Sequence, residues 1–120
     1  MYSAKLLDHF SNPRNVGEVT DASLKIAVEN PVCGDQLRVS VRIENGQISE
    51  ARFLARGCTS AIACGSALTG WLTGKNLKAL PGLVAEEVET EVGGLNPESK
   101  HAAVLCADVV KQLEAAWKKF

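Results

Sequence analysis

Four side chains of this sequence have the chemistry of metal ligands, and each lies at a predicted boundary between secondary-structure elements. They are Cys33, Asp35, Cys58 and His101. Loops and helix starts are where a rigid scaffold usually presents functional side chains. Thiolate and imidazole together suit zinc or an iron–sulfur centre, and carboxylate is a harder, more labile ligand. The sequence therefore predicts one metal centre bound through these residues, with Asp35 at or near the fourth position.

Glycines stand beside both cysteines. Cys33 and Asp35 flank Gly34 in a turn predicted between two strands, and Cys58 follows Gly57 just before a predicted helix. A glycine lets the backbone approach a bound ion, and neighbouring amides can donate hydrogen bonds to sulfur. A helix N-terminus stabilises negative charge, so a lowered pKa is expected for Cys58.

Each of these residues also has a structural interpretation. A free cysteine often fills space in a core. Asp35 by itself is typical of a turn in which the side chain bonds its own backbone. His101 by itself suits a surface or capping position, and His9, beside Asp8 in a predicted helix, is interpreted as structural. The cysteine spacing is not that of a C-x-x-C zinc knuckle.

The elements that must position these residues begin with a short helix over residues 2–10, which Pro13 follows closely. Its apolar face is formed by Tyr2, Leu6 and Phe10, with Leu7 beside it. The pattern then alternates with a period of two over residues 24–29, 37–44 and 47–55. Residues 45–46 are Asn-Gly, the strongest short signal for a hairpin turn. Three antiparallel strands with one apolar side need a helical cover.

Helices are predicted after the strands. One covers residues 60–73 and ends at Gly74, and its many small residues favour close packing. Short helical pieces are predicted over 76–80 and 84–92, with a break at residues 93–94. A cap at Asn96 and a proline at the first position begin a last helix that runs to residue 120. Its buried stripe is predicted to contain Ala102, Leu105, Cys106, Val109, Leu113, Ala116, Trp117 and Phe120.

Length, charge and cysteine content restrict the class of protein. A chain of 120 residues, 46% hydrophobic and 22% charged, indicates one globular domain over residues 1–120. A net charge of −1 argues against a nucleic acid or an anionic membrane as partner. The first ten residues do not resemble a signal peptide, and no apolar run reaches the roughly 18 residues of a membrane span. We therefore expect a cytoplasmic protein with reduced cysteines.

The motifs around the predicted ligands, and those of the N-terminus, resemble the U-type iron–sulfur scaffold family, which includes IscU and the N-terminal domain of NifU. The resemblance covers nearly all of the chain, and the combination of motifs is highly specific. The matching segments are residues 2–3, 7–10 and 12–17, Pro31-Val32-Cys33-Gly34-Asp35, Ala51-Arg52-Phe53, Gly57-Cys58-Thr59-Ser60-Ala61-Ile62-Ala63, and Gly74-Lys75 followed by Leu77.

This resemblance implies an α+β fold of three antiparallel strands with helices packed on one face. It also implies a scaffold rather than an enzyme, one that accepts sulfur from a cysteine desulfurase, binds iron, builds a [2Fe–2S] cluster and passes it to apo iron–sulfur acceptor proteins. Cys33, Cys58 and His101 take the places of the family's ligands. Asp35 takes the place of the residue that ligates zinc or keeps the cluster labile.

The chain departs from the family pattern in two places. Ala102 replaces the family's third cysteine, the usual sulfur acceptor, and Cys64 and Cys106 are additional. One hypothesis is that Cys106, one turn beyond Ala102, replaces the lost thiolate, with Cys64 extending the ligand set; the alternative is that both pack in the core. Residues 95–99 read Leu-Asn-Pro-Glu-Ser where the family's chaperone-docking motif is Leu-Pro-Pro-Val-Lys, so a dedicated Hsp70-type chaperone is a doubtful partner.

Three hypotheses about function remain open from the sequence. The first is a divergent scaffold that binds a [2Fe–2S] cluster or iron with a rearranged ligand set. The second is a zinc-holding sulfur acceptor of the same fold that carries no cluster. The third is a regulatory relative that binds the desulfurase without metal chemistry, and the retention of Cys33, Asp35, Cys58 and His101 together argues against it.

Overall fold

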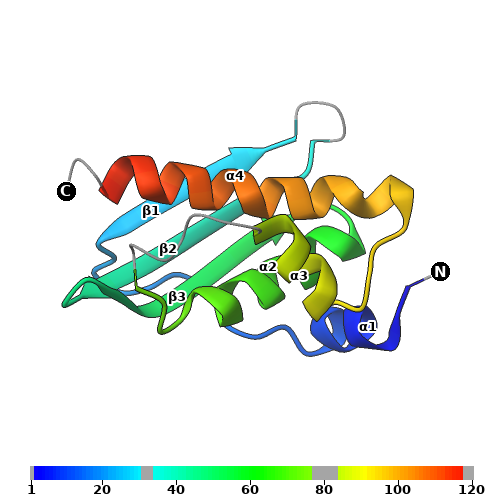
Figure 1. The fold of residues 1–120 in the computed structure, drawn as a ribbon, viewed down its shortest axis with the longest axis horizontal. Coiled ribbons are helices and arrows are strands. Elements are labelled where there is room, and N and C mark those ends of the chain that lie inside the picture. Colours follow the sequence, from blue (N-terminus) through cyan, green and yellow to red (C-terminus); the bar gives the residue numbers. More distant parts are fainter. Residues whose placement is uncertain (1, 31–33, 77–83, 118–120) are drawn as a thin grey trace.

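Three antiparallel strands form one sheet in the order β1-β2-β3, as the alternating patterns predict. The strands are β1 (Leu24–Glu29), β2 (Gln36–Glu44) and β3 (Gln47–Arg56). The structure is a computed structural model that describes residues 2–30, 34–76 and 84–117 (Figure 1). Cys33, Phe120 and residues 77–80 of the helical piece predicted at 76–80 lie outside these residues, and Asn76 forms an isolated β-bridge with Gln47 instead of starting a helix. The inward residues Leu37, Val39 and Val41 of β2 are at most 1% exposed.

The strand register brings two chain segments together at one end of the sheet. Gln36 is paired with Glu29 on one side and with Arg56 on the other. The β1–β2 loop and the chain leaving β3 are therefore neighbours in space. At the opposite end, Asn45 and Gly46 form the predicted hairpin turn, with φ angles of 54° and 75°. Such positive φ angles are typical of the two central residues of this turn.

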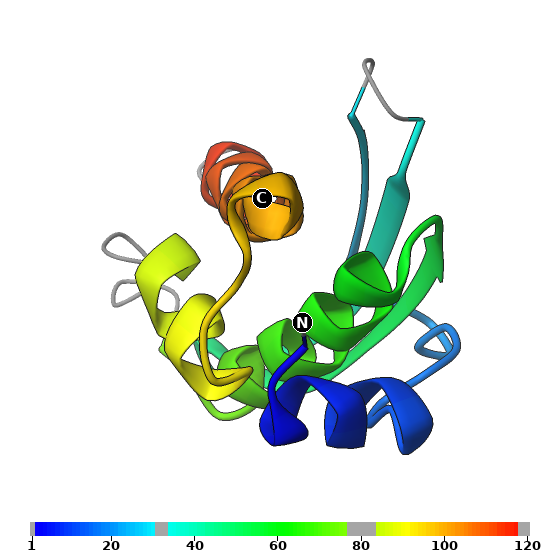
Figure 2. The same cartoon turned by 90° about the vertical axis from the view of Figure 1, so that its right-hand side faces the viewer.

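Two helices, α2 (Thr59–Leu72) and α4 (Lys100–Trp117), cover the same face of the sheet (Figures 1 and 2). The small residues of α2 allow a close approach to the strand beneath it. A Cβ atom added at Gly65 would lie 2.6 Å from the Phe53 ring. Real Cβ contacts are never this short, so this position of the helix requires glycine. The other helices, α1 (Ala4–Ser11) and α3 (Val84–Glu91), pack against α2 and α4 from outside.

The N-terminal helix differs from its prediction in what it buries. Ser3 caps α1, and its hydroxyl accepts a hydrogen bond from the Leu6 amide. Only Leu6 of the predicted apolar face is buried; Tyr2 and Phe10 are each 39% exposed. The physical reason is that Tyr2 precedes the helix, which starts at Ala4, and that α1 lies at the edge of the molecule, where it packs against α2 (Figure 2).

The last helix also begins differently from its prediction. Residues Pro97–Ser99 form a 3₁₀ turn, η2, and the α-helix starts at Lys100. Asn96 precedes the proline as predicted, but its side chain makes no capping hydrogen bond. The predicted stripe is buried from Ala102 to Leu113, and Ala103 and Val110 are buried as well. They are covered because α3 packs against a second side of α4.

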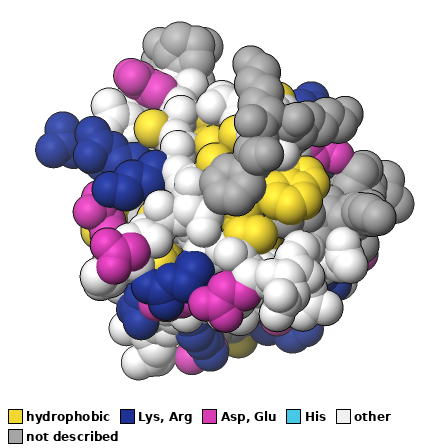
Figure 3. Space-filling model, turned by 90° about the vertical axis from the view of Figure 1, so that its left-hand side faces the viewer, with side chains coloured by type: hydrophobic (Ala, Val, Ile, Leu, Met, Phe, Trp, Pro, Cys, Tyr) yellow, Lys and Arg dark blue, Asp and Glu magenta, His cyan; other side chains and the backbone are white. Residues whose placement is uncertain are grey.

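The end of the molecule that carries the β2–β3 turn has basic and acidic side chains interspersed (Figure 3). This mixture agrees with the net charge of −1. Among the described residues, no helix is long and apolar enough to cross a membrane.

Candidate metal centre

Three of the predicted ligands meet at the end of the sheet where the β1–β2 loop and the start of α2 are neighbours. The ligand atoms of Asp35, Cys58 and His101 all lie within 4.8 Å of one another. His101 Nε2 is 2.9 Å from Asp35 Oδ2 and 3.6 Å from Cys58 Sγ. The Cys58 thiol donates a hydrogen bond of 3.2 Å to the same Asp35 oxygen. The fold thus gathers three different donor types from three separate segments.

The backbone of the β1–β2 loop sets the position of Asp35. The Asn30 amide donates to the Asp35 carbonyl at 2.8 Å, and the Gly34 amide donates to the Asn30 carbonyl at 2.7 Å. Gly34 has a φ of 75°, a conformation that glycine adopts without strain. Asp35 is only 5% exposed, so its carboxylate is held beneath the surface rather than in solvent.

Gly57 makes room for that carboxylate. A Cβ atom at this position would lie 2.2 Å from Asp35 Oδ1 and 2.6 Å from its Cγ. The φ of Gly57 is 141°, which side chains rarely adopt. The sequence signal for this role is the glycine directly before Cys58, but the partner that needs the space is 22 residues earlier and is seen only in the fold.

Cys58 is the N-cap residue of α2, and its side chain makes no capping hydrogen bond. The backbone amides of Ala61 and Ser60 nevertheless lower the pKa of the thiol, as the helix-start argument predicts. Burial and the neighbouring Asp35 carboxylate raise it, and the net pKa lies above the ordinary value. The predicted lowered pKa is therefore wrong, because desolvation and a nearby negative charge outweigh the amides. A cation between Cys58 and Asp35 would remove this penalty for the thiolate.

His101 lies in the first turn of α4, as predicted, and its side chain is about one quarter exposed. The next residue, Ala102, is 1% exposed and belongs to the core. The two neighbours point in different directions because successive residues of a helix are about 100° apart. The imidazole is thus at the edge of the protein, where it can meet the two other donors and also a partner from outside.

The additional cysteines lie elsewhere. Cys64 on α2 and Cys106 on α4 are both 0% exposed, and the Cys106 thiol donates to the Cys64 carbonyl at 3.6 Å. The Cys64 side chain and complete burial raise the pKa of Cys106 well above its usual range. Neither thiol belongs to the group of donor atoms formed by Asp35, Cys58 and His101 among the described residues. The predicted ligand role of Cys106 stays a prediction.

One further polar group lies near this helix start. The hydroxyl of Ser60 is 0% exposed and has no hydrogen-bond partner within the described residues. Buried polar groups without partners are rare in folded proteins and often mark functional positions. Ser60 follows Cys58 by two residues, so its amide faces the sulfur while its side chain is enclosed.

The donor set determines what the arrangement can do chemically. Carboxylate oxygen, thiolate sulfur and imidazole nitrogen can bind zinc or iron together, and they leave a fourth position of a tetrahedral site open. The residues present therefore fit a metal ion of this kind. Cys33, the predicted fourth ligand, precedes Gly34 by one residue and lies outside the described part of the chain.

Comparison with known proteins places this chain in a family. The family of the NifU-like N terminal domain matches residues 1–120. IscU 1 of Archaeoglobus fulgidus, an iron-sulfur cluster assembly scaffold protein, is 37% identical over 112 residues, which are 93% of this chain and 73% of that protein. The protein named iron-sulfur cluster assembly scaffold protein IscU in Escherichia coli K12 is 36% identical over 125 residues, covering 98% and 94%.

The fold has solved counterparts. The crystal structure of FiSufU from Fervidobacterium islandicum, described as a candidate iron-sulfur cluster assembly scaffold of the SUF system, superposes with a TM-score of 0.71 and 15% identity. The superposition covers 92% of this chain and 93% of FiSufU, and it confirms the predicted fold class. The family match and the two IscU relatives confirm the resemblance read from the motifs. This chain belongs to the family of the NifU-like N terminal domain.

Proposed function

We propose that this protein is a scaffold on which an iron–sulfur cluster is assembled and from which it is transferred. The observation that carries the proposal is the meeting of Asp35, Cys58 and His101 donor atoms within 4.8 Å at one end of the sheet. The names of the two IscU relatives support it. Those relatives are named as scaffold proteins, not as enzymes, and we propose no turnover of a small substrate here.

In this proposal the cargo is iron or a [2Fe–2S] cluster held by Cys58, His101 and the predicted ligand Cys33. Metal binding displaces the Cys58 proton, and the Ala61 and Ser60 amides then stabilise the thiolate. Asp35 occupies the same site with a hard, exchangeable oxygen ligand. Without cargo, Asp35 Oδ2 accepts hydrogen bonds from Cys58 and His101. Asp35 can form these two hydrogen bonds again when the cargo leaves.

The partners follow from this chemistry. A cysteine desulfurase would supply sulfur, and apo iron–sulfur proteins would accept the finished cluster. We propose that both reactions take place in the cytoplasm, where thiols are normally kept reduced. The partially exposed His101 gives such partners access to the cargo, while the carboxylate behind it is buried.

A zinc-holding sulfur acceptor is the second candidate function, and one observation favours it. Ala102 stands where the family's third cysteine is expected, and it lies in the core. The donors that do meet are one thiol, one imidazole and one carboxylate, a set that zinc accepts in tetrahedral geometry.

Metal content decides between the candidates. We expect the protein, reconstituted anaerobically with iron, sulfide and a cysteine desulfurase, to show the charge-transfer absorption and Mössbauer spectrum of a [2Fe–2S] cluster. A Cys33→Ser/Cys58→Ser variant should bind neither metal, and Cys64→Ala serves as the control that also removes a thiol. Zinc retention without cluster formation would favour the second candidate. Wild-type metal occupancy in the double variant would refute both.

A further inference from the structure

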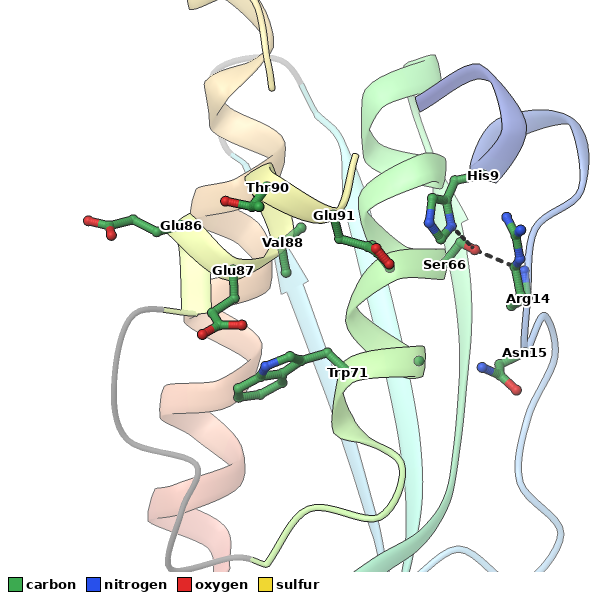
Figure 4. Close-up of a pocket in the computed structure, with 12 residues that line it drawn as sticks. His9, Arg14, Asn15, Ser66, Trp71, Glu86, Glu87, Val88, Thr90 and Glu91 are labelled. Carbon is green, nitrogen blue, oxygen red and sulfur yellow. Dashed lines mark hydrogen bonds between the residues drawn. The ribbon is translucent and has the colours of Figure 1, made fainter. Parts of the chain in front are cut away.

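A cavity of about 720 Å³ lies between α1, α2 and α3, apart from the metal centre (Figure 4). One wall is α3, and the other is formed by the α1 end of the chain and by α2. None of Asp35, Cys58 and His101 lines it. Its volume is in the range of pockets that bind small ligands, and it can admit a long side chain together with part of the backbone that carries it.

The indole of Trp71 forms the aromatic wall. Figure 4 shows it extending from α2 toward α3, with the Glu87 side chain directed at it. The ring already attracts a cation, since the ammonium of Lys75 lies 5.1 Å from its centroid. An aromatic face beside a carboxylate is an arrangement that binds lysine or arginine.

The α3 wall is strongly acidic. Four of the eight residues of Val84–Glu91 are glutamates, and Glu86, Glu87 and Glu91 line the cavity. Among the described residues, only Glu89 of the four has an ion pair within 4 Å, with Lys100. Glu87 and Glu91 are four residues apart and so share one helix face, where like charges repel. A cation between them would relieve that repulsion.

The polar groups of the opposite wall are bound to one another or to neighbouring residues of this chain. His9 Nδ1 lies 2.8 Å from the buried Ser66 hydroxyl, which also accepts the Arg14 amide at 2.9 Å. The Arg14 guanidinium is bound by Asp8 at 2.6 Å. The one arginine on this wall is therefore neutralised within the chain, and the charge that faces the cavity is negative.

We propose that this cavity is a docking site for a basic peptide segment of a partner protein, with one lysine or arginine side chain inserted between Trp71 and the carboxylates of Glu87 and Glu91. The charge of the α3 wall and the cation affinity of the Trp71 ring select this occupant. An acidic segment would be repelled by the carboxylates of the α3 wall, and a purely apolar one would bury them. The site is independent of the metal chemistry and brings a partner to the α3 side of the molecule.

NMR titration of the whole protein tests this proposal, because the chain has two tryptophans. The probe is an amidated heptapeptide with lysines at its first, fourth and seventh positions and alanines between them. At low salt we expect the indole N–H signal of Trp71 to shift with saturation while that of Trp117 stays in place. Neutralising two carboxylates in Glu87→Gln/Glu91→Gln should weaken binding about tenfold.

The controls separate a docking site from general attraction by charge. Glu18→Gln/Glu44→Gln changes the net charge equally at remote positions and should leave the affinity within twofold. The same peptide with glutamates in place of lysines should not bind. The proposal is overturned if the Trp71 signal does not shift, if both double variants weaken binding equally, or if spermidine binds as tightly as the peptide.

Discussion

The Asp35 carboxylate fits beside residue 57 only because that residue is glycine. A Cβ atom on Gly57 would lie 2.2 Å from the carboxylate oxygen Oδ1 of Asp35. The residue before the proposed ligand Cys58 is thus a glycine because of a residue in the β1–β2 loop. The relationship explains how a carboxylate that is 5% exposed can lie beside a thiol and an imidazole without displacing either.

Gly57→Ala should therefore damage the metal centre more than the fold. The added methyl group pushes the Asp35 carboxylate away from Cys58 and His101, so we expect zinc affinity, measured by competition with a chromophoric chelator, to fall at least about tenfold. Gly46→Ala is the matched control, because it also has positive φ but open space around it. Both should lose about 1–3 kcal/mol of stability. Equal zinc affinity in the two variants would show that Asp35 does not need this space.

Asp35→Ala should lengthen the lifetime of a bound cluster. Without the carboxylate the site loses its exchangeable oxygen ligand, and the negative charge that raises the pKa of Cys58 is gone. The decay of cluster absorbance in air and the transfer rate to an apo-ferredoxin measure this. Asp108→Ala removes a carboxylate of α4 as a control. Faster decay in Asp35→Ala than in the control would contradict the labilising role.

Cys106→Ala should reduce stability without changing metal content. The thiol is 0% exposed and packs against Cys64, so its removal leaves a small cavity that costs about 1 kcal/mol. Denaturant unfolding and metal analysis of the same samples separate the two effects. Cys58→Ala is the complementary variant: we expect it to lose the metal while its free energy of unfolding stays nearly unchanged. Altered cluster spectra in Cys106→Ala would instead support the hypothesis that this thiol is a ligand.

Stability should decrease in mild acid because of His9. Burial lowers the pKa of His9 below its ordinary value of 6.5. The unfolded chain then takes up the proton first, so this contribution to stability is complete above about pH 6.5 and is lost as the pH falls toward the folded pKa. Urea unfolding between pH 5 and 8 measures how the free energy of unfolding changes with pH. This change should be smaller for His9→Asn than for the wild type. An identical change in the two proteins would exclude His9 as the source.

A peptide of residues 94–100 should stimulate a dedicated Hsp70-type chaperone weakly. In the protein, Leu95 packs against the core, Ser99 is 6% exposed, and Lys100 is paired with Glu89. In the isolated peptide the cause is the sequence itself, since Asn96 stands where the docking motif has proline, Glu98 puts a charge where it has valine, and Ser99 lacks the lysine. Steady-state ATPase assays with a peptide containing Leu-Pro-Pro-Val-Lys provide the reference. Equal stimulation by the two peptides would contradict this prediction.

Alternation, turn residues and helix stops in the sequence were sufficient for the three strands, the Asn45–Gly46 turn, α2, α3 and the course of α4, although not for the 3₁₀ turn that precedes α4. These signals are local, because side-chain period and turn chemistry depend on near neighbours. The same local pattern was misleading at the N-terminus, where the helix starts only at Ala4 and where Tyr2 and Phe10 stay 39% exposed while Leu6 is buried. The amount of cover over a face depends on elements far along the chain.

The sequence also predicts the types of the metal ligands, since few residue types offer a thiolate, an imidazole or a carboxylate, and the cysteines and the aspartate stand beside glycines. Only the tertiary structure decided that Asp35, Cys58 and His101 meet, because 66 residues separate the first from the last. It also reversed the expected pKa of Cys58, since burial and the charge of Asp35 arise only after folding. The pairing of Trp71 with the α3 glutamates has the same origin: helix packing, not sequence spacing, brings a ring and carboxylates to one cavity.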